Sequence, residues 1–334
     1  MSGSYYDYTL KRLQALYPFS KKTTEWVATR AVKQQTFKTY EALFAYVGVP
    51  DPALHIAKNG DGVPYIDIQA KAKHQKGVLV VHVSMGNPLD PNQLYQTAAI
   101  ADINPEYRVI AFGNPSGKPY HVAEQKLSFK KWFSIAFTKN VRPLVHAELD
   151  YLASQNIIET TQIGFSYGAL KASIESCEQP AGSVKQIIIV DPASHPRNPI
   201  RLARDFMRTY KPLGEYINRV ESETFHQARG DSARMRDYAK SYLRPVNIAI
   251  GILLSRTSIV RVLQRLIARN PEVKVVAAWG TASELTDDAT FNTHLKNLPG
   301  IRKGALKTMR MKGQKHAFAN DIYLHAAIIR EALV

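Results

Sequence analysis

The chain has 334 residues, of which 45% are hydrophobic, and a formal net charge of +16. This length allows one large domain with an insertion or two modest domains, and the hydrophobic content suffices for a sizeable core. The single cysteine, Cys177, excludes an internal disulfide and fits a reducing compartment. No Cys/His group has the spacing of metal ligands, so we expect neither a structural metal nor another cofactor.

The distribution of apolar residues also bears on the cellular location. The longest uninterrupted apolar stretch, residues 248–254, is far too short to span a bilayer. Polar and charged side chains, including Asp7, Lys11 and Arg12, interrupt the segment where a secretory signal needs a continuous apolar core. We therefore expect a cytoplasmic protein without an integral membrane segment.

Residues 1–54 are predicted to form a helical extension, since Leu10, Leu13 and Leu16 and then Val27 and Ala31 recur at roughly helical intervals. The runs 55–57 and 65–68 flank Asn59-Gly60-Asp61-Gly62, a turn sequence typical of a β-hairpin. Residues 77–83 then form a continuous run typical of a fully buried strand, and 93–103 have helical spacing.

The same alternation of strand and helix continues along the chain. Further strands are predicted at 108–112, 162–165, 184–190, 273–279 and 306–311, and helices at 141–154, 169–176 and 322–333. Strands that alternate with helices indicate an α/β fold with a mostly parallel central sheet covered by helices.

Residues 194–270 interrupt this rhythm, and proline residues mark both ends of the segment. We predict an Arg-rich helical cap at 194–270, inserted into a core formed by 55–193 and 271–334. Between Arg197 and Arg269 the chain has fifteen Lys or Arg residues against six Asp or Glu. Two series fall at helical spacing and would form basic stripes: Arg197, Arg201, Arg204 and Arg208, and then Arg261, Arg265 and Arg269. The stripes are either solvated helix faces or contacts for an anionic substrate, a phospholipid surface or a nucleic acid.

The sequence Gly164-Phe165-Ser166-Tyr167-Gly168 lies between a predicted strand and a predicted helix. A serine at the tip of such a sharp turn has a strained backbone, and glycine on both sides avoids steric clashes. This G-x-S-x-G pattern therefore predicts a nucleophile elbow at Ser166.

With this elbow, residues 55–334 resemble the α/β-hydrolase superfamily. Two further motifs carry the resemblance. His82-Val83-Ser84-Met85-Gly86 follows the first buried strand, where the superfamily usually has His-Gly-x-Gly, and residues 111–117 match its loop after the next strand. Gly313-Gln314-Lys315-His316 follows the last strand, where the superfamily places its catalytic histidine.

The resemblance implies a role for each of these residues. Ser166 is the expected nucleophile and His316 the base that activates it, because a serine hydroxyl is a poor nucleophile at neutral pH. The backbone N–H groups of Tyr167 and Ser84 are the expected donors to the oxyanion. Val83 departs from the pattern, since the superfamily usually has glycine there.

The carboxylate that orients His316 has several candidates. The usual acid lies about three residues past a glycine after the penultimate strand, but Ser283 stands at that place and Glu284 follows it. We assign the acid to Glu284, with Asp191 as the alternative because it resembles a second acid position used in the superfamily. Asp287 and Asp288 are further candidates, and Asp191 also fits a non-catalytic role in capping its loop.

These features predict a serine hydrolase, esterase-like or lipase-like, that cleaves a carboxylic ester or thioester through an acyl-enzyme at Ser166. Its substrate is expected to be a small-molecule ester or acyl compound, anionic compounds included. The alternative is a catalytically inactive hydrolase-fold protein that binds an anionic partner through its basic cap.

Overall fold

A computed structural model describes residues 13–32, 53–56, 62–84, 91–114, 128–138, 141–206, 208–209 and 245–334. The described part contains an eight-stranded sheet in the order β1-β2-β4-β3-β5-β6-β7-β8. The β1–β2 and β2–β4 pairs are antiparallel, and the pairs from β4 to β8 are all parallel. The strands are β1 (Ala53–Ile56), β2 (Gly62–Ile68), β3 (Gly77–His82), β4 (Tyr107–Phe112), β5 (Thr160–Phe165), β6 (Val184–Val190), β7 (Lys274–Gly280) and β8 (Leu306–Met311).

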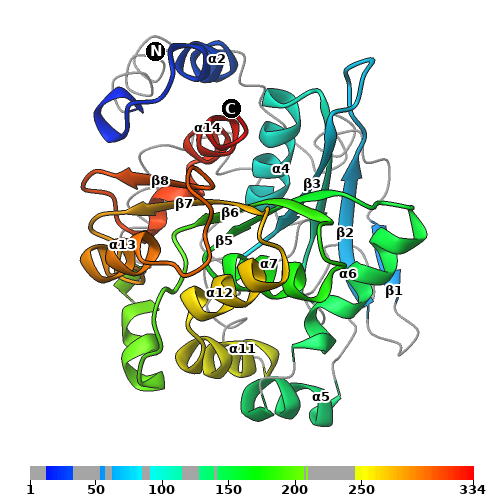
Figure 1. Ribbon diagram of the computed structural model, residues 1–334, viewed down its shortest axis with the longest axis vertical. Helices are drawn as coiled ribbons and strands as arrows, with labels where there is room; N and C mark the ends of the chain where they lie inside the picture. Colours follow the sequence, from blue (N-terminus) through cyan, green and yellow to red (C-terminus); the bar gives the residue numbers. More distant parts are fainter. Residues whose placement is uncertain are drawn as a thin grey trace.

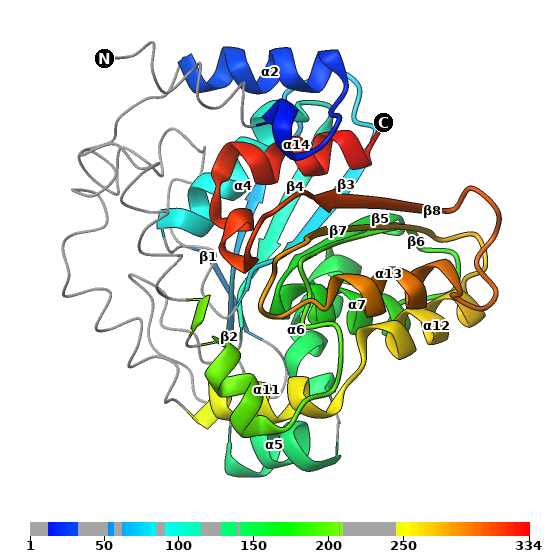
Figure 2. The same cartoon turned by 90° about the vertical axis from the view of Figure 1, so that its left-hand side faces the viewer.

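Helices cover both faces of this sheet (Figures 1 and 2). One side carries α2 (Lys21–Val32), α4 (Pro91–Ile103) and α14 (Ile322–Ala332). The other carries α6 (Arg142–Ser154), α7 (Tyr167–Glu178), α12 (Ile259–Arg269) and α13 (Asp288–Lys296). The mostly parallel sheet with helices on both faces confirms the predicted fold class.

The second half of strand β6, residues 187–190, is apolar without interruption. Ile188 and Val190 pack into the core cluster that includes α4 and α14, whereas Ile187 and Ile189 pack into the cluster that includes α7 and α12. Since successive side chains of a strand point to opposite faces, a strand covered on both sides needs apolar residues at every position. The same argument accounts for the buried run in β3.

The described part of the predicted cap consists of a helix over 199–206, α11 (Pro245–Arg256) and α12. Helix α11 contacts α5 (Phe129–Phe133) and the π-helical turn η1 (Ser134–Thr138), and Figure 1 shows α11 and α5 next to each other. Helix α12 instead packs against α7, next to the sheet. Residues 210–244, a large part of the predicted cap, lie outside the described residues.

The N-terminal extension contacts the end of the chain. Its helix α2 packs on α14, and Figure 2 shows the two one above the other. Glu331 of α14 accepts hydrogen bonds from the hydroxyl groups of Ser20 and Thr23, each at 2.9 Å. Val27 is fully buried in the same core cluster as α14. Leu10 and the turn at 59–61 lie outside the described residues.

Candidate active site

Ser166 occupies the turn between β5 and α7. Its backbone has φ 55° and ψ −118°, and positive φ is uncommon for a residue other than glycine. Its N–H donates to the carbonyl of Val190 at 2.9 Å, which fixes the turn beside the end of β6. A strained residue of this kind persists only where the surrounding structure imposes it, and such residues concentrate at functional sites.

The two glycines of the elbow are explained by close contacts. A Cβ atom on Gly164 would lie 2.2 Å from the carbonyl oxygen of Gly168. A Cβ atom on Gly168 would lie 2.1 Å from the carbonyl oxygen of His82, at the end of β3. Real Cβ atoms do not approach backbone oxygens so closely, so the turn requires glycine on both sides of the serine.

His316 begins the short 3-10 helix η2 (His316–Asn320), in the connection between β8 and α14. Its ring stacks on that of Phe165, the residue before Ser166, with 5.2 Å between ring centroids and 25° between planes. Its Nδ1 lies 2.5 Å from Oδ2 of Asp191. With Asp191 ionised, the carboxylate can only accept, so Nδ1 carries the hydrogen and Nε2 is left as an acceptor. This is the tautomer that a general base requires.

Asp191 follows β6 directly, has a φ of 40° and is fully buried. Besides the His316 ring, it accepts from the N–H of Gly280 at 2.8 Å and from the hydroxyl of Ser283 at 2.6 Å. Its own N–H donates to the carbonyl of Ala278 at 2.7 Å. Three donors thus fix the carboxylate, two of them from the segment at the end of β7.

Glu284, the acid assigned from the sequence, contacts a different part of the histidine. Its Oε2 accepts from the backbone N–H of His316 at 3.1 Å. The contact supports the peptide of His316, whereas the ring is held by Asp191. Ser283 stands at the position where the superfamily usually has its acid. Here its hydroxyl donates to Asp191, which contacts the His316 ring.

The other two acid candidates have different partners. The side chain of Asp287 caps the N-terminus of α13 by accepting from the N–H of Thr290 at 2.8 Å. This hydrogen bond lowers the pKa of Asp287. Asp288 pairs with Arg310 and accepts from the indole N–H of Trp279 at 2.7 Å.

The predicted oxyanion donors lie on two adjoining elements. Tyr167 is the first residue of α7, where backbone N–H groups lack intrahelical partners and the helix dipole favours negative charge. Ser84 follows β3 by two residues, and its carbonyl accepts from the side-chain amide of Asn114 at 2.9 Å. Because Gly168 presses against the carbonyl of His82, the end of β3 and the start of α7 are in direct contact. Met85, Gly86 and residues 115–117 of the resembling motifs lie outside the described residues.

The arginines of the predicted cap differ in their surroundings. Arg197 is largely buried and donates to Asp205 at 2.8 Å and to the carbonyls of Glu284 and Leu285 at 2.7 and 3.0 Å. It therefore anchors the start of the insertion. On α12, by contrast, the arginines of the predicted stripe are exposed on the face opposite the apolar residues that contact α7: Arg261, Arg265 and Arg269.

Known proteins were compared with the chain by sequence and by structure. No protein-family model and no curated protein matches the sequence. Among solved structures, the chain is similar to an acetylester hydrolase from Corynebacterium glutamicum, with a TM-score of 0.58 and 12% identity over 90% of this chain and 98% of that one. It is also similar to a bromoperoxidase from Bacillus anthracis, with a TM-score of 0.56 and 13% identity over 85% of this chain and 98% of that one. For an α/β-hydrolase fold protein from Chitinophaga pinensis, the TM-score is 0.50 and the identity 15%, over 84% of this chain and 96% of that one.

These similarities and the sheet order show that the chain has the α/β-hydrolase fold. None of the helices in the described part combines the length and hydrophobicity that a membrane span requires.

Proposed function

We propose that the protein is a serine hydrolase that cleaves a carboxylic ester or thioester through an acyl-enzyme at Ser166. The observation that carries the proposal is the contact between Asp191 and the Nδ1 of His316, whose ring stacks on the residue preceding Ser166. The proposed triad is Ser166, His316 and Asp191, so Asp191 replaces Glu284 as the acid. Glu284 keeps a supporting role at the His316 peptide.

The chemistry follows from this arrangement. Nε2 of His316 takes the proton of the Ser166 hydroxyl as its oxygen attacks the acyl carbon, and Asp191 stabilises the imidazolium that results. The N–H groups of Ser84 and Tyr167 donate to the oxyanion. His316 then gives its proton to the departing alcohol or thiol. Water, activated in the same way, attacks the acyl-enzyme and releases the acid together with free Ser166.

Labelling with a fluorophosphonate probe tests the nucleophile, because the probe reacts with activated serines. We expect labelling of the wild type and none of Ser166→Ala, together with loss of p-nitrophenyl ester hydrolysis. Ser176→Ala is the matched control, since Ser176 lies on α7 and donates within that helix, to the carbonyl of Ala172 at 2.7 Å. Unchanged hydrolysis by Ser166→Ala would refute the proposal.

The exposed arginines of α12 favour a second candidate function, binding of an anionic partner, with or without catalysis. Retention on heparin or on anionic vesicles should fall with rising salt, and should fall further when Arg261, Arg265 and Arg269 are replaced by glutamine. A wild type that binds but is not labelled at Ser166 would favour the catalytically inactive alternative. Equal retention of wild type and triple variant would leave α12 as a solvated face.

A further inference from the structure

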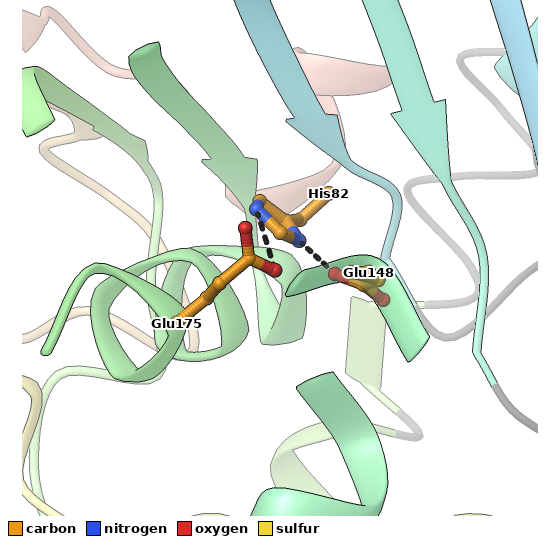
Figure 3. Close-up of side chains that lie close together, drawn as sticks. All are labelled: His82, Glu148 and Glu175. Atoms are coloured by element: carbon orange, nitrogen blue, oxygen red, sulfur yellow. Dashed lines mark ion pairs between the residues drawn. The ribbon is translucent and has the colours of Figure 1, made fainter. Parts of the chain in front are cut away.

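A cluster of buried titratable side chains joins β3, α6 and α7 (Figure 3). His82 at the end of β3 lies between Glu148 of α6 and Glu175 of α7, with Nδ1 3.3 Å from Glu148 and Nε2 3.8 Å from Glu175. The ammonium of Lys171, also on α7, pairs with Glu148. The side chains of these four residues are at most 1% exposed.

The charges in this cluster balance one another. Burial alone would raise the pKa of Glu148, but the positive charge of the nearby Lys171, together with the adjacent Glu175 and His82 side chains, lowers it below its usual range. The pKa of Glu175 is raised by burial and by the charge of Glu148. One carboxylate thus faces one ammonium, and the raised pKa of Glu175 opposes a second buried negative charge beside it.

This balance bears on metal binding, because His82, Glu148 and Glu175 are close enough together to ligate a metal ion. A dication bound to Glu148 would meet the ammonium of Lys171, which already pairs with that carboxylate. The charge distribution therefore favours a built-in ion pair over a metal site.

Lys171 makes a second contact that leads toward the candidate oxyanion site. Its ammonium donates to the carbonyl of Gly113, just after β4, at 2.5 Å. The next residue, Asn114, donates from its side chain to the carbonyl of Ser84 at 2.9 Å. Lys171 also lies one turn along α7 from Tyr167 and Gly168. Two hydrogen bonds and one peptide therefore connect α7 to the loop of Ser84.

We propose that Lys171 is a positioning residue: held by Glu148, it fixes Gly113 and Asn114. Asn114 in turn holds the carbonyl of Ser84, and so places residue Ser84, whose own N–H is the expected oxyanion donor, relative to the Tyr167 N–H. The inference rests on the proposed hydrolase function. The simpler role for Lys171 is to neutralise Glu148, in which case its bond to Gly113 is incidental to catalysis.

Two variants separate these roles. Lys171→Met leaves Glu148 buried without its cation, and such a charge is strongly destabilising, so this variant need not fold well. The double variant Lys171→Met/Glu148→Gln removes both charges and should recover much of the melting temperature. We expect its kcat on a p-nitrophenyl ester to stay about tenfold to hundredfold below the wild type with KM little changed, since a displacement of about 1 Å can cost about a hundredfold.

Arg330→Met is the matched control, because Arg330 is a buried cation of α14 that pairs with Glu106 at 2.9 Å, in the helical layer on the opposite side of the sheet. It should lower the melting temperature without changing kcat. Wild-type kcat in the double variant would overturn the proposal and leave Lys171 as a neutralising charge. A stoichiometric divalent metal in the purified wild type, lost in His82→Ala, would also overturn it.

The hydrolase proposal is tested separately from the role of Lys171. A wild type that is not labelled by fluorophosphonate at Ser166 would contradict the hydrolase proposal itself. A crystal structure of the double variant tests the positioning without any activity measurement. We expect Gly113, Asn114 and Ser84 to shift relative to Tyr167, and an unchanged loop would contradict the inference.

Discussion

At the scale of single residues, the carboxylate beside His316 is selected by the surrounding hydrogen-bond donors. Asp191 receives the imidazole N–H, a backbone N–H and the Ser283 hydroxyl, whereas Glu284 receives the His316 peptide N–H. Charge-assisted hydrogen bonds are stronger than neutral ones, and a fully buried carboxylate needs them to offset the loss of hydration. The two acids are therefore expected to differ sharply in their effect on the rate.

Asp191→Asn should lower kcat by about 10³-fold to 10⁴-fold, because an amide at this position can hold the imidazole in the wrong tautomer. Glu284→Gln should cost less than about tenfold, since glutamine keeps an oxygen that accepts from the peptide N–H of His316. Steady-state kinetics on one p-nitrophenyl ester compares the two. A larger loss in Glu284→Gln than in Asp191→Asn would restore Glu284 as the acid.

Ser283→Ala removes one of the donors to Asp191 and leaves the other two in place. The loss of a hydrogen bond to a charged group is worth about 1.5–3 kcal/mol, so we expect kcat to fall by roughly tenfold to a hundredfold. Ser176→Ala serves again as the control. Wild-type kcat in Ser283→Ala would show that the peptide N–H of Gly280 is sufficient to orient the acid.

At the scale of elements, strand and helix positions could be predicted more reliably than the way in which loops meet. Strands β6 and β8 occupy the residues predicted for them, and in β6 the buried run 187–190 leaves a continuous apolar signal. The nucleophile turn was also predictable, since its steric demand is local to residues 164–168. The sequence alone left Glu284 and Asp191 both open as the acid, because the contact of Asp191 with the His316 ring depends on the ends of β6 and β7 and the start of η2 converging in space.

The close contact between α7 and β3 at Gly168 can be tested by substitution. Gly168→Ala should lower stability and strongly reduce hydrolysis, since its Cβ would lie 2.1 Å from the His82 carbonyl and force α7 away from the Ser84 loop. Gly251→Ala in α11 is the control, because a Cβ placed there meets, among the described residues outside its own helix backbone and chain neighbours, no atom within 4 Å. Alanine has the higher helix propensity, so this control should be neutral or stabilising by up to about 1 kcal/mol.

Circular dichroism melting and ester hydrolysis measure both variants. A Gly168→Ala protein that melts and hydrolyses like the wild type would mean that α7 and β3 are not in the close contact described here.

At the scale of the whole molecule, residues far apart in the chain stabilise each other. Helix α2 packs on α14, and Glu331 joins them through Ser20 and Thr23. The guanidinium of Arg330 also lies over the indole of Trp26 in α2, with its Cζ atom 4.1 Å from the centroid of the Trp26 ring. The apolar spacing of residues 13–27 predicted a helical extension, but it could not identify α14 as the partner, because the partner face comes from the other end of the sequence.

The Glu331 contact predicts a dependence of stability on pH. Burial alone would raise the pKa of Glu331, but hydrogen bonds from Thr23 and Ser20, together with Lys307, lower it. A carboxyl group with a lowered folded-state pKa stabilises the fold above its unfolded pKa of about 4.3, and this contribution is lost as the pH falls through the folded value. Glu331→Gln should therefore reduce the free energy of unfolding at pH 7 by about 1–3 kcal/mol.

Thermal melts across pH measure this effect. The deficit of Glu331→Gln should shrink as the pH falls below about 4, where the wild-type carboxyl also takes up a proton. A deficit that is the same at pH 7 and pH 3 would show that the charge of Glu331 contributes nothing. Lys21 forms an exposed ion pair with Glu25, with 3.7 Å between its Nζ and the carboxylate oxygen. Lys21→Ala should therefore have almost no effect on stability at either pH.

The packing of α2 on α14 also has a consequence for biosynthesis. Ser20 and Glu331 are separated by 311 positions, so the ribosome produces α2 long before the helix that covers it. At about 5–20 residues per second, the apolar side of α2, including Val27, waits roughly 15–60 s for its partner. During that time the nascent chain exposes a hydrophobic helix face, which stays uncovered until α14 has been synthesised.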